Sequence, residues 1–392
     1  MSQLLNERWS ETKEALLEGL SGNRRASMQV CLENTRKYLA ESATAGATSS
    51  GNIATLNRVI LPVIRRVMPT VIANEIIGVQ PMTGPVAQIH TLRVRYADSG
   101  DNVVAGEEAL SPFKIASAYS GNNVDATPKA AVTSLLEGQP GKRMSIQILK
   151  TPVEAKSRKL SARWTFEAAQ DAQAQQGIDI EAEIMAALAQ EITTEIDQEI
   201  LNSLRGLASV EQTYDQSLVS GTATFVGDEH AALAIQINRT ANLIAQRTRR
   251  GAANWAVVSN QALTILQSAT TSAFARTTEG TFEAPTNTKF VGTLNGAMRI
   301  YVDAYLNDTG ADSNQVLVGY KGSSEADAAA FYCPYIPLMS SGVVLDPATF
   351  EPVVGFLTRY GYVELSNTAS SLGNAADYLG KVAITSANVS FQ

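Results

Sequence analysis

The sequence predicts an α+β protein of two or more domains, organised around one long helix. A chain of 392 residues can bury a sizeable core and exceeds the usual size of a single domain. Its composition, with 45% hydrophobic and 18% charged residues, is typical of a globular protein. A strict four-residue apolar repeat predicts the helix, and segments of alternating apolar and polar residues on both sides of it predict strands.

The helix is predicted for residues 180–205, where an apolar side chain recurs at every fourth position. These side chains are Ile184, Leu188, Ile192, Ile196, Ile200 and Leu204. Asp179 is a candidate N-cap and Gly206 a natural stop, so the helix would be roughly 40 Å long. A four-residue repeat drifts about 40° per step, so the stripe should wind and contact different partners at its two ends. The alternative is an ordinary long core helix.

The N-terminal segment is expected to lie outside the main core. Residues 3–40 predict helix with a break at Gly22, and residues 41–52 predict a linker because they contain no large apolar side chain. The following residues, 53–85, are strongly apolar, and two prolines, Pro62 and Pro69, divide them into short helical pieces.

A long extended excursion is predicted between a strand at Gln88–Tyr96 and the return of the chain at Ser161–Trp164. Residues 98–162 show no strong core periodicity and are rich in Gly, Ser, Asn and Lys, with strand-like pieces such as Ser145–Leu149. Because a structureless loop of this length is improbable inside a compact domain, we expect a β-structured arm.

The arm and the helix that follows it carry net charges of opposite sign. Residues 93–163 carry 11 basic and 7 acidic side chains, whereas residues 166–205 carry 9 acidic and one basic. We interpret the asymmetry as a basic arm that contacts the acidic helix of a neighbouring copy; the alternative is unrelated solvated faces. The candidate contact residues are Arg93, Arg95, Lys142, Arg143, Lys150, Lys156, Arg158 and Lys159 on the arm, and Glu181, Glu183, Glu191 and Glu195 on the helix.

Residues 221–350 predict a second α/β unit. Trp255–Val258 is a short apolar strand, and Ser259 or Asn260 can cap the helix that follows it. Asn295-Gly296 is a strong hairpin signal. Further strands are predicted at 315–320, 332–339, 343–345, 352–365 and 378–389, and we expect the last two to return to the first domain.

Catalytic and metal sites are not indicated. The chain has two histidines, His90 and His230, both interpreted as structural, and contains neither a GxSxG nor a GxxxxGK[ST] motif. The acids of the long helix spread around its surface, so paired-carboxylate catalysis is not expected. We therefore predict no cofactor and no metal.

Other classes of protein are also disfavoured. The two cysteines, Cys31 and Cys333, do not form a disulfide framework and indicate a reducing compartment. A net charge of −7 disfavours unspecific adsorption to nucleic acid. The N-terminus lacks the apolar core of a signal peptide, and the densest apolar run, residues 59–64, is too short to cross a membrane.

Several ordered segments resemble the major capsid proteins of T-even-like tailed bacteriophages, over roughly residues 52–365. They are GVQPMTGP (78–85), WTFEAAQD (164–171), FVGTLNG (290–296) with RIYVDAY (299–305), VGYKG (318–322), YCPYIPLM (332–339), and DPATFEPVVGF (346–356) with TRYG (358–361). Their order and number make the resemblance specific.

The resemblance implies the Hong Kong 97-like capsid fold. It implies an N-terminal arm at 1–51, a peripheral domain at 52–92 and 164–220 that contains the spine helix, an E-loop at 93–163, an axial domain at 221–350, and peripheral return strands with the C-terminal tail at 351–392. In this fold the E-loop lies over a neighbouring subunit.

The implied function is mechanical and not enzymatic. Hexamers and pentamers of the subunit would tile an icosahedral virion shell, assembled in the bacterial cytoplasm, that encloses double-stranded DNA without specific binding. Expected partners are other copies, a portal protein, and vertex, scaffold or decoration proteins. The alternatives are an encapsulin-like nanocompartment shell and a soluble cytosolic α/β enzyme.

Members of such families often lose their N-terminal segment to a protease that cuts after a Leu/Ile-x-Glu triplet. Leu39-Ala40-Glu41, followed by Ser42, fits this pattern, and so do two other triplets, Leu16-Leu17-Glu18 and Leu135-Leu136-Glu137. We expect the arm to be retained.

Overall fold

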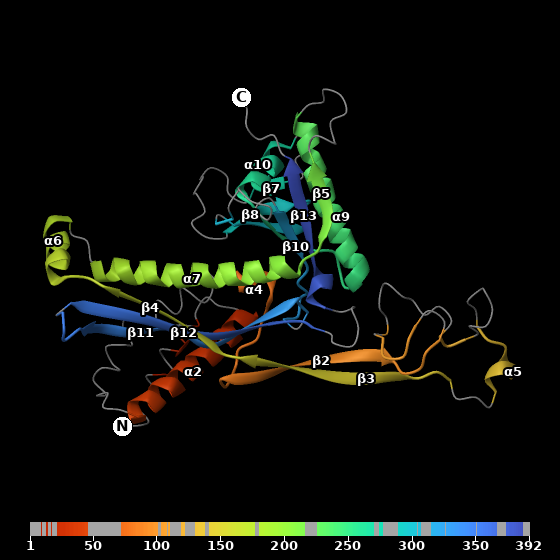
Figure 1. Ribbon diagram of the computed structural model, residues 1–392, viewed down its shortest axis with the longest axis horizontal. Coiled ribbons are helices and arrows are strands. Elements are labelled where there is room, and N and C mark those ends of the chain that lie inside the picture. The colour runs from red at the N-terminus through yellow and green to blue at the C-terminus, as the bar shows by residue number, and fades with distance from the viewer. Residues whose placement is uncertain are drawn as a thin grey trace. The chain divides into compact units, whose positions relative to one another are not determined.

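The computed structural model contains both helices and strands, as predicted (Figure 1). It describes residues 9, 13–14, 17, 22–45, 72–100, 103–107, 109, 119–121, 130–137, 141–176, 180–215, 226–269, 274–276, 289–303, 305–306, 315–325, 327–349, 351–366 and 374–386. Asp179, Pro62, Pro69 and residues 46–52 lie outside this part, so their predicted roles remain predictions.

The helices are α2 (Gly22–Ala45), α4 (Ala73–Ile76), α5 (Thr133–Leu136), α6 (Phe166–Gln176), α7 (Ile180–Leu207), α9 (Val226–Thr248), α10 (Asn260–Ser268) and the 3-10 helix η2 (Ala375–Tyr378). The strands are β1 (Gly78–Val79), β2 (Val86–Tyr96), β3 (Met144–Glu154), β4 (Lys156–Arg163), β5 (Val210–Asp215), β6 (Trp255–Val258), β7 (Phe274–Arg276), β8 (Lys289–Leu294), β9 (Met298–Val302), β10 (Gln315–Gly319), β11 (Ala330–Leu345), β12 (Pro352–Glu364) and β13 (Leu379–Ser386).

The chain forms two compact units, and it passes between them several times. Unit 1 comprises Met1–Ala87, Pro152–Asn202 and Phe331–Val363. Unit 2 comprises Gln88–Thr151, Ser203–Ala330 and Glu364–Gln392. These units divide the chain differently from the predicted arm, E-loop, peripheral domain and axial domain, whose boundaries remain predictions.

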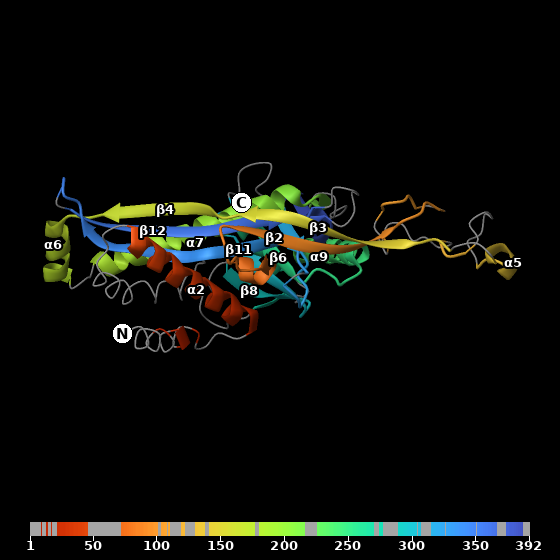
Figure 2. The same cartoon turned by 90° about the horizontal axis from the view of Figure 1, so that it is seen from below.

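Unit 1 contains a four-stranded sheet in the order β1-β11-β12-β4 (Figure 2). β12 and β4 are antiparallel over eight residue pairs, from Val353 opposite Arg163 to Tyr360 opposite Lys156. β11 contains two prolines, and proline lacks the N–H that a central strand uses. Proline is tolerated in β11 because the neighbouring strand β1 is only two residues long. The chain after β1 donates to β11 instead, and Met82 N lies 2.9 Å from Pro334 O.

Helix α7 confirms the predicted spine helix (Figure 1). Its repeat is buried at Ile192, Ile196, Ile200 and Leu204, whereas Ile184 and Leu188 are only half-buried. In that first part of the helix the buried side chains are Met185 and Ala189, one position further on. This shift of one residue is the drift expected when a four-residue repeat runs along a helix of 3.6 residues per turn.

Helix α2 overturns two expectations about the N-terminal arm. It begins at Gly22, where φ is +61°, and runs to Ala45, so the predicted linker starts as helix. Its Cys31 and Leu32 side chains are 0% exposed, and Asn34 Nδ2 donates to Met82 O at 2.6 Å and Tyr335 O at 3.0 Å. The arm therefore packs into unit 1 instead of lying outside its core.

Unit 2 contains a seven-stranded sheet in the order β5-β13-β10-β6-β9-β8-β7. Helices α9 and α10 supply Ile237, Ile244 and Ile265 to one fully buried core with strand residues such as Val258 and Val316. Two local predictions are confirmed here. Ser259 caps α10 by accepting from Ala262 N, and the β8–β9 hairpin turns at Asn295-Gly296, with φ values of 53° and 68°.

Three strands join sheets other than the expected ones. β4 was predicted to belong to the E-loop and β11 to the axial domain, but both belong to the sheet of unit 1. β13, expected to return to the first domain, instead lies between β5 and β10 in unit 2. Alternating apolar and polar residues predict that a strand buries one face, but they do not predict which of two sheets the strand joins.

Two glycines of β12 allow a matched test of packing in unit 1. A Cβ at Gly361 would lie 2.4 Å from Val153 Cγ1 and 3.2 Å from Glu154 O, whereas one at Gly355 would lie 3.5 Å from Ser341 Oγ. We expect Gly361→Ala to destabilise the subunit by about 1–3 kcal/mol through overpacking. Gly355→Ala should cost less, and equal thermal midpoints of the two variants would contradict this packing.

His230 is expected to make unit 2 acid-sensitive. Ser268 Oγ donates to Ile265 O, so His230 Nδ1–H donates to Ser268 Oγ at 2.5 Å, and the buried Nε2 has no hydrogen-bond partner among the described residues. Burial lowers the pKa of His230 below its ordinary value of 6.5, although the Glu229 carboxylate opposes this.

Because the folded pKa is lowered, the unfolded chain binds more protons, and stability falls as pH drops below 6.5. His230→Asn, which keeps a donor near the position of Nδ1, should show a flatter pH dependence of the thermal midpoint between about pH 7 and about pH 5. Parallel curves for the two proteins would refute this role of His230.

Candidate functional site

The paired strands β2 and β3 expose an apolar stripe. They form a two-stranded sheet of their own, with no further strand in the described part of the chain. Met144, Ile146 and Ile148 alternate along β3 and therefore share one face, and they are 54%, 70% and 60% exposed. Three large apolar side chains in a row on an exposed ribbon are typical of a surface that another molecule covers.

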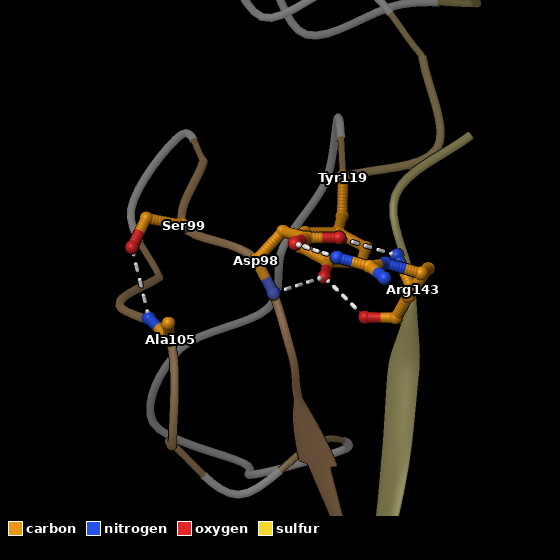
Figure 3. A network of polar contacts seen from close by, with 5 residues as sticks. All are labelled: Asp98, Ser99, Ala105, Tyr119 and Arg143. Carbon is orange, nitrogen blue, oxygen red and sulfur yellow. Dashed lines mark hydrogen bonds and ion pairs between the residues drawn. The ribbon is translucent and has the colours of Figure 1, made fainter. Parts of the chain in front are cut away.

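The ends of the ribbon are joined by a polar network around Tyr119 (Figure 3). The Tyr119 hydroxyl donates to Arg143 O at 2.6 Å and accepts from Asp98 N at 3.2 Å, so one buried side chain bridges the end of β2 and the start of β3. Arg143 N donates to Asp98 Oδ2 at 2.8 Å, and Ala97 N donates to Arg143 O at 3.0 Å. Backbone groups make most of these bonds.

Beyond the ribbon the chain has a small core of its own. Tyr96, Val103, Ala109 and Tyr119 are buried together, and the rings of Tyr96 and Tyr119 lie 4.6 Å apart. Lys142 Nζ lies 5.3 Å from the Tyr119 ring centroid, a cation–π distance. The sequence suggested no core in this stretch, because the four residues follow neither helical nor strand spacing.

The ion pair of this network is weaker than its backbone bonds. The Arg143 side chain is 77% exposed and lies 3.3 Å from Asp98 Oδ1, so solvent screens the pair. The pKa of Asp98 is lowered, chiefly by the hydrogen bond from the Arg143 backbone and then by the one from its side chain. Lys142 and Arg143, predicted as contacts with a neighbour, therefore also hold the end of the β2–β3 ribbon together.

A second network, inside unit 1, uses two other predicted residues. Arg158 of β4 donates to Glu195 Oε2 at 2.6 Å and Glu199 Oε2 at 2.5 Å on α7, and to Tyr360 Oη of β12 at 2.6 Å. The Tyr360 hydroxyl also donates to Glu199. One guanidinium thus ties the spine helix to two strands of the same subunit.

The charge states of this network follow from its bonds. Partial burial alone would lower the pKa of Arg158 and raise that of Glu199. The hydrogen bonds among Arg158, Glu199 and Tyr360 outweigh burial, so the pKa of Arg158 is raised and that of Glu199 is lowered. Burial raises the pKa of Tyr360, so its hydroxyl keeps the proton that it donates.

These contacts bear on the predicted interface, which remains a prediction. Arg158 and Glu195 pair within one subunit, so the basic arm meets an acidic helix first in its own chain. Arg95 is buried on β2, and the side chain of Arg93 lies outside the described part. Besides Arg143 and Glu195, which each form an ion pair within the subunit, the exposed predicted residues are Lys150, Lys156, Lys159, Glu183 and Glu191, and Glu181 is half-buried.

The apolar stripe was missed by the sequence analysis. The alternation Met144, Ile146, Ile148 was visible, but alternation is normally a sign of a face packed on a core. Only the absence of a third strand in the described ribbon shows that this face is uncovered. Glu41 and Ser42, the predicted cleavage residues, lie within helix α2, and their side chains are outside the described part.

Catalytic features do not emerge from the part of the chain that the structure describes. Within it, no three His, Cys, Asp or Glu side chains gather to hold a metal ion, and no helix is long and apolar enough to cross a bilayer. His90 lies exposed on β2, and the two cysteines are buried thiols whose pKa values burial raises to about 12. The prominent exposed apolar surface among the described residues is the face of β3 that carries Met144, Ile146 and Ile148.

A subunit with a long spine helix, two sheets and an uncovered β-ribbon defines a structural protein that associates with other copies. The chain belongs to the family of the major capsid protein Gp23, whose model matches residues 53–134 and 125–384. It is similar to the major capsid protein of Vibrio phage KVP40, with 31% identity over 85% of this chain and 81% of the relative. The major capsid protein of Enterobacteria phage T4 is 29% identical over 83% and 78%.

Two solved capsid structures resemble the chain. The mature capsid of bacteriophage PhiM1 has a TM-score of 0.45 and 14% identity, covering 78% of this chain and 83% of that one. The capsid of Myoviridae phage XM1 has a TM-score of 0.44 and 10% identity, covering 78% and 89%.

Family membership confirms the predicted resemblance to major capsid proteins, and the helices and strands of the structure agree with the predicted α+β class. The protein is a major capsid protein, a virion component of a family that is not an enzyme family. The alternatives of a nanocompartment shell and a soluble enzyme are not supported.

The Arg158 network is expected to show energetic coupling. A double-mutant cycle of Arg158→Met and Glu199→Gln should give about 1 kcal/mol, limited by screening because both side chains are partly exposed. The matched control is Arg143→Met with Asp98→Asn, for which we expect a smaller coupling because solvent screens this exposed pair. Because the folded pKa of Glu199 is lowered, its contribution is full above the ordinary value of 4.5 and is lost as pH falls through the folded value.

The measurement is the unfolding free energy of each variant at neutral and acid pH. A coupling in the Arg158 pair no larger than in the control, or one that persists unchanged in acid, would contradict this network.

Proposed function

We propose that copies of this major capsid protein close into hexamers and pentamers that tile an icosahedral head around packaged double-stranded DNA. The observation that carries the proposal is the exposed apolar stripe of β3, formed by Met144, Ile146 and Ile148. On this proposal the stripe of one subunit is covered by a neighbouring subunit of the same ring.

The energetics suit such an assembly. Full burial of each of the three side chains contributes about 1.5–3 kcal/mol through the hydrophobic effect. Because each is more than half exposed in the free subunit, most of this stabilisation is gained only when another molecule covers them. A single ribbon contact is modest, but a subunit in a closed shell makes several at once, so weak contacts add up. A ring-shaped arrangement uses each subunit both as donor of a ribbon and as acceptor of the next one.

Charge supports the direction of docking. The ribbon and β4 keep Lys150, Lys156 and Lys159 exposed, and α7 keeps Glu183 and Glu191 exposed. We propose that these side chains meet across the subunit boundary, in place of Arg158 and Glu195. Exposed pairs of this kind add little affinity, but they select register and speed association.

The remaining partners follow from the same proposal. A head that packages DNA needs a portal, and vertex, scaffold or decoration proteins would complete it; assembly would take place in the bacterial cytoplasm. A net charge of −7 suits a wall that encloses DNA without binding it specifically.

Paired substitutions on the two faces of β3 test the proposal. Ile146→Asp with Ile148→Asp places two charges in the proposed contact, and we expect loss of closed shells with little change in the thermal midpoint of the free subunit. The control is Ser145→Asp with Gln147→Asp, which adds the same charges to the opposite face of the same strand.

Electron microscopy of assembled particles reads out the result. The control should form shells and the isoleucine variant should remain as unassembled subunits. Normal shells from the isoleucine variant, with an unchanged subunit midpoint, would refute the apolar stripe as an intersubunit contact.

A further inference from the structure

The last turn of the spine helix α7 is held by a buried ion pair. Arg205 Nη2 donates to Asp303 Oδ2 at 2.6 Å, and the two side chains are 10% and 0% exposed. Both residues belong to unit 2, whereas α7 up to Asn202 belongs to unit 1. The pair therefore anchors in unit 2 the end of a helix whose longer part belongs to the other unit.

Backbone bonds fix the position of the carboxylate. Asp303 follows β9 directly, and its N–H donates to Val258 O at 3.0 Å, which extends the parallel pairing of β9 with β6 by one residue. Asp303 Oδ1 accepts from Tyr305 N at 3.1 Å, a short turn that ends the strand. The other carboxylate oxygen is thus presented to Arg205 by backbone that is held on both sides.

Stability alone does not explain a buried ion pair at this place. Removing two charges from water costs free energy, and well-packed apolar side chains of similar volume often give equal or greater stability. Apolar burial, however, has no direction. Leu201 and Leu204 are 0% exposed at the same end of α7, and they gain from any arrangement that keeps them out of water. A charge-assisted hydrogen bond has one best geometry, so it selects one arrangement.

We propose that Arg205 and Asp303 are a positioning pair, which sets one rotation and register of the end of α7 on unit 2 and is needed for shell closure, not for folding. Asp303 lies in RIYVDAY (299–305), a segment that the proposed contacts between copies do not use. A closed shell requires every copy to present its contacts in the same geometry, and two proposed contact residues, Glu183 and Glu191, lie on α7. The effect on closure rests on the proposed function, whereas the fixed register is a property of the single subunit.

A neutral variant tests the pair. Arg205→Met with Asp303→Asn removes both charges, and the amide oxygen can still accept from Tyr305 N. The matched control, Arg247→Met with Glu211→Gln, removes another ion pair of unit 2, also 2.6 Å long and largely buried, which joins α9 to β5. A third variant, Arg205→Lys, keeps the charge at the end of α7.

Pulsed EPR on the free subunit measures the register. Spin labels at Glu191→Cys on α7 and Gln246→Cys on α9 report one distance, since both positions are exposed and the native cysteines are buried. We expect a narrow distance distribution for the unmodified, control and Arg205→Lys proteins, and one about twofold wider for the neutral variant.

Two results on the free subunit would overturn the positioning role. One is a distribution of equal width in the neutral variant and the control. The other is a neutral variant that does not fold or whose thermal midpoint falls well below that of the control, because the pair would then serve stability. A distribution as wide for Arg205→Lys as for the neutral variant would show that the charge does not set the register.

Electron microscopy of assembled particles separates this role from the proposed function. The unmodified and control chains should form closed shells, and the neutral variant should form roughly tenfold fewer, because its copies no longer share one geometry. If the unmodified chain forms no shells, the proposed function fails and the EPR result still decides the register. Normal shells from the neutral variant would overturn the link between register and closure.

Discussion

The subunit depends on the continuous burial of one face of helix α7. Ile192, Ile196 and Ile200 are at most 2% exposed, and each contributes about 1.5–3 kcal/mol by leaving water. Asp197 lies on the same face, and its buried carboxylate accepts from Ile72 N at 2.9 Å, which satisfies the start of α4. A helix held along this face can serve as a fixed axis for the strands and arms around it.

The ribbon β2–β3 obeys the opposite constraint. A two-stranded sheet has no second layer, so it cannot bury an apolar face by itself. Its internal order comes from Tyr119, which bridges the strand ends through its hydroxyl and packs on Tyr96. The ribbon is thus stiffened at its end while Ile146 and Ile148 stay exposed, which is the combination that a docking arm requires.

Arg158 shows that opposite charge along the chain does not by itself identify the partner. A basic arm and an acidic helix do meet, through Glu195 and Glu199, but within one subunit. Composition counts charges along the chain and carries no information on which copy of the helix is nearest. In the subunit the Tyr360 hydroxyl, more than 200 residues away, accepts from Arg158 and donates to Glu199, so it joins both charges in one network.

By itself, the sequence determined the features that short-range physics controls. These are the period of α7, the Ser259 cap, the turn at Asn295-Gly296 and the existence of most strands, because each follows from neighbouring residues alone. The tertiary structure decided where β4, β11 and β13 pair, that Asn34 docks α2 into unit 1, and that the face of Ile146 is left uncovered. Those outcomes depend on which distant segment competes best for the same apolar face, and alternation along a strand is the same whichever segment covers it.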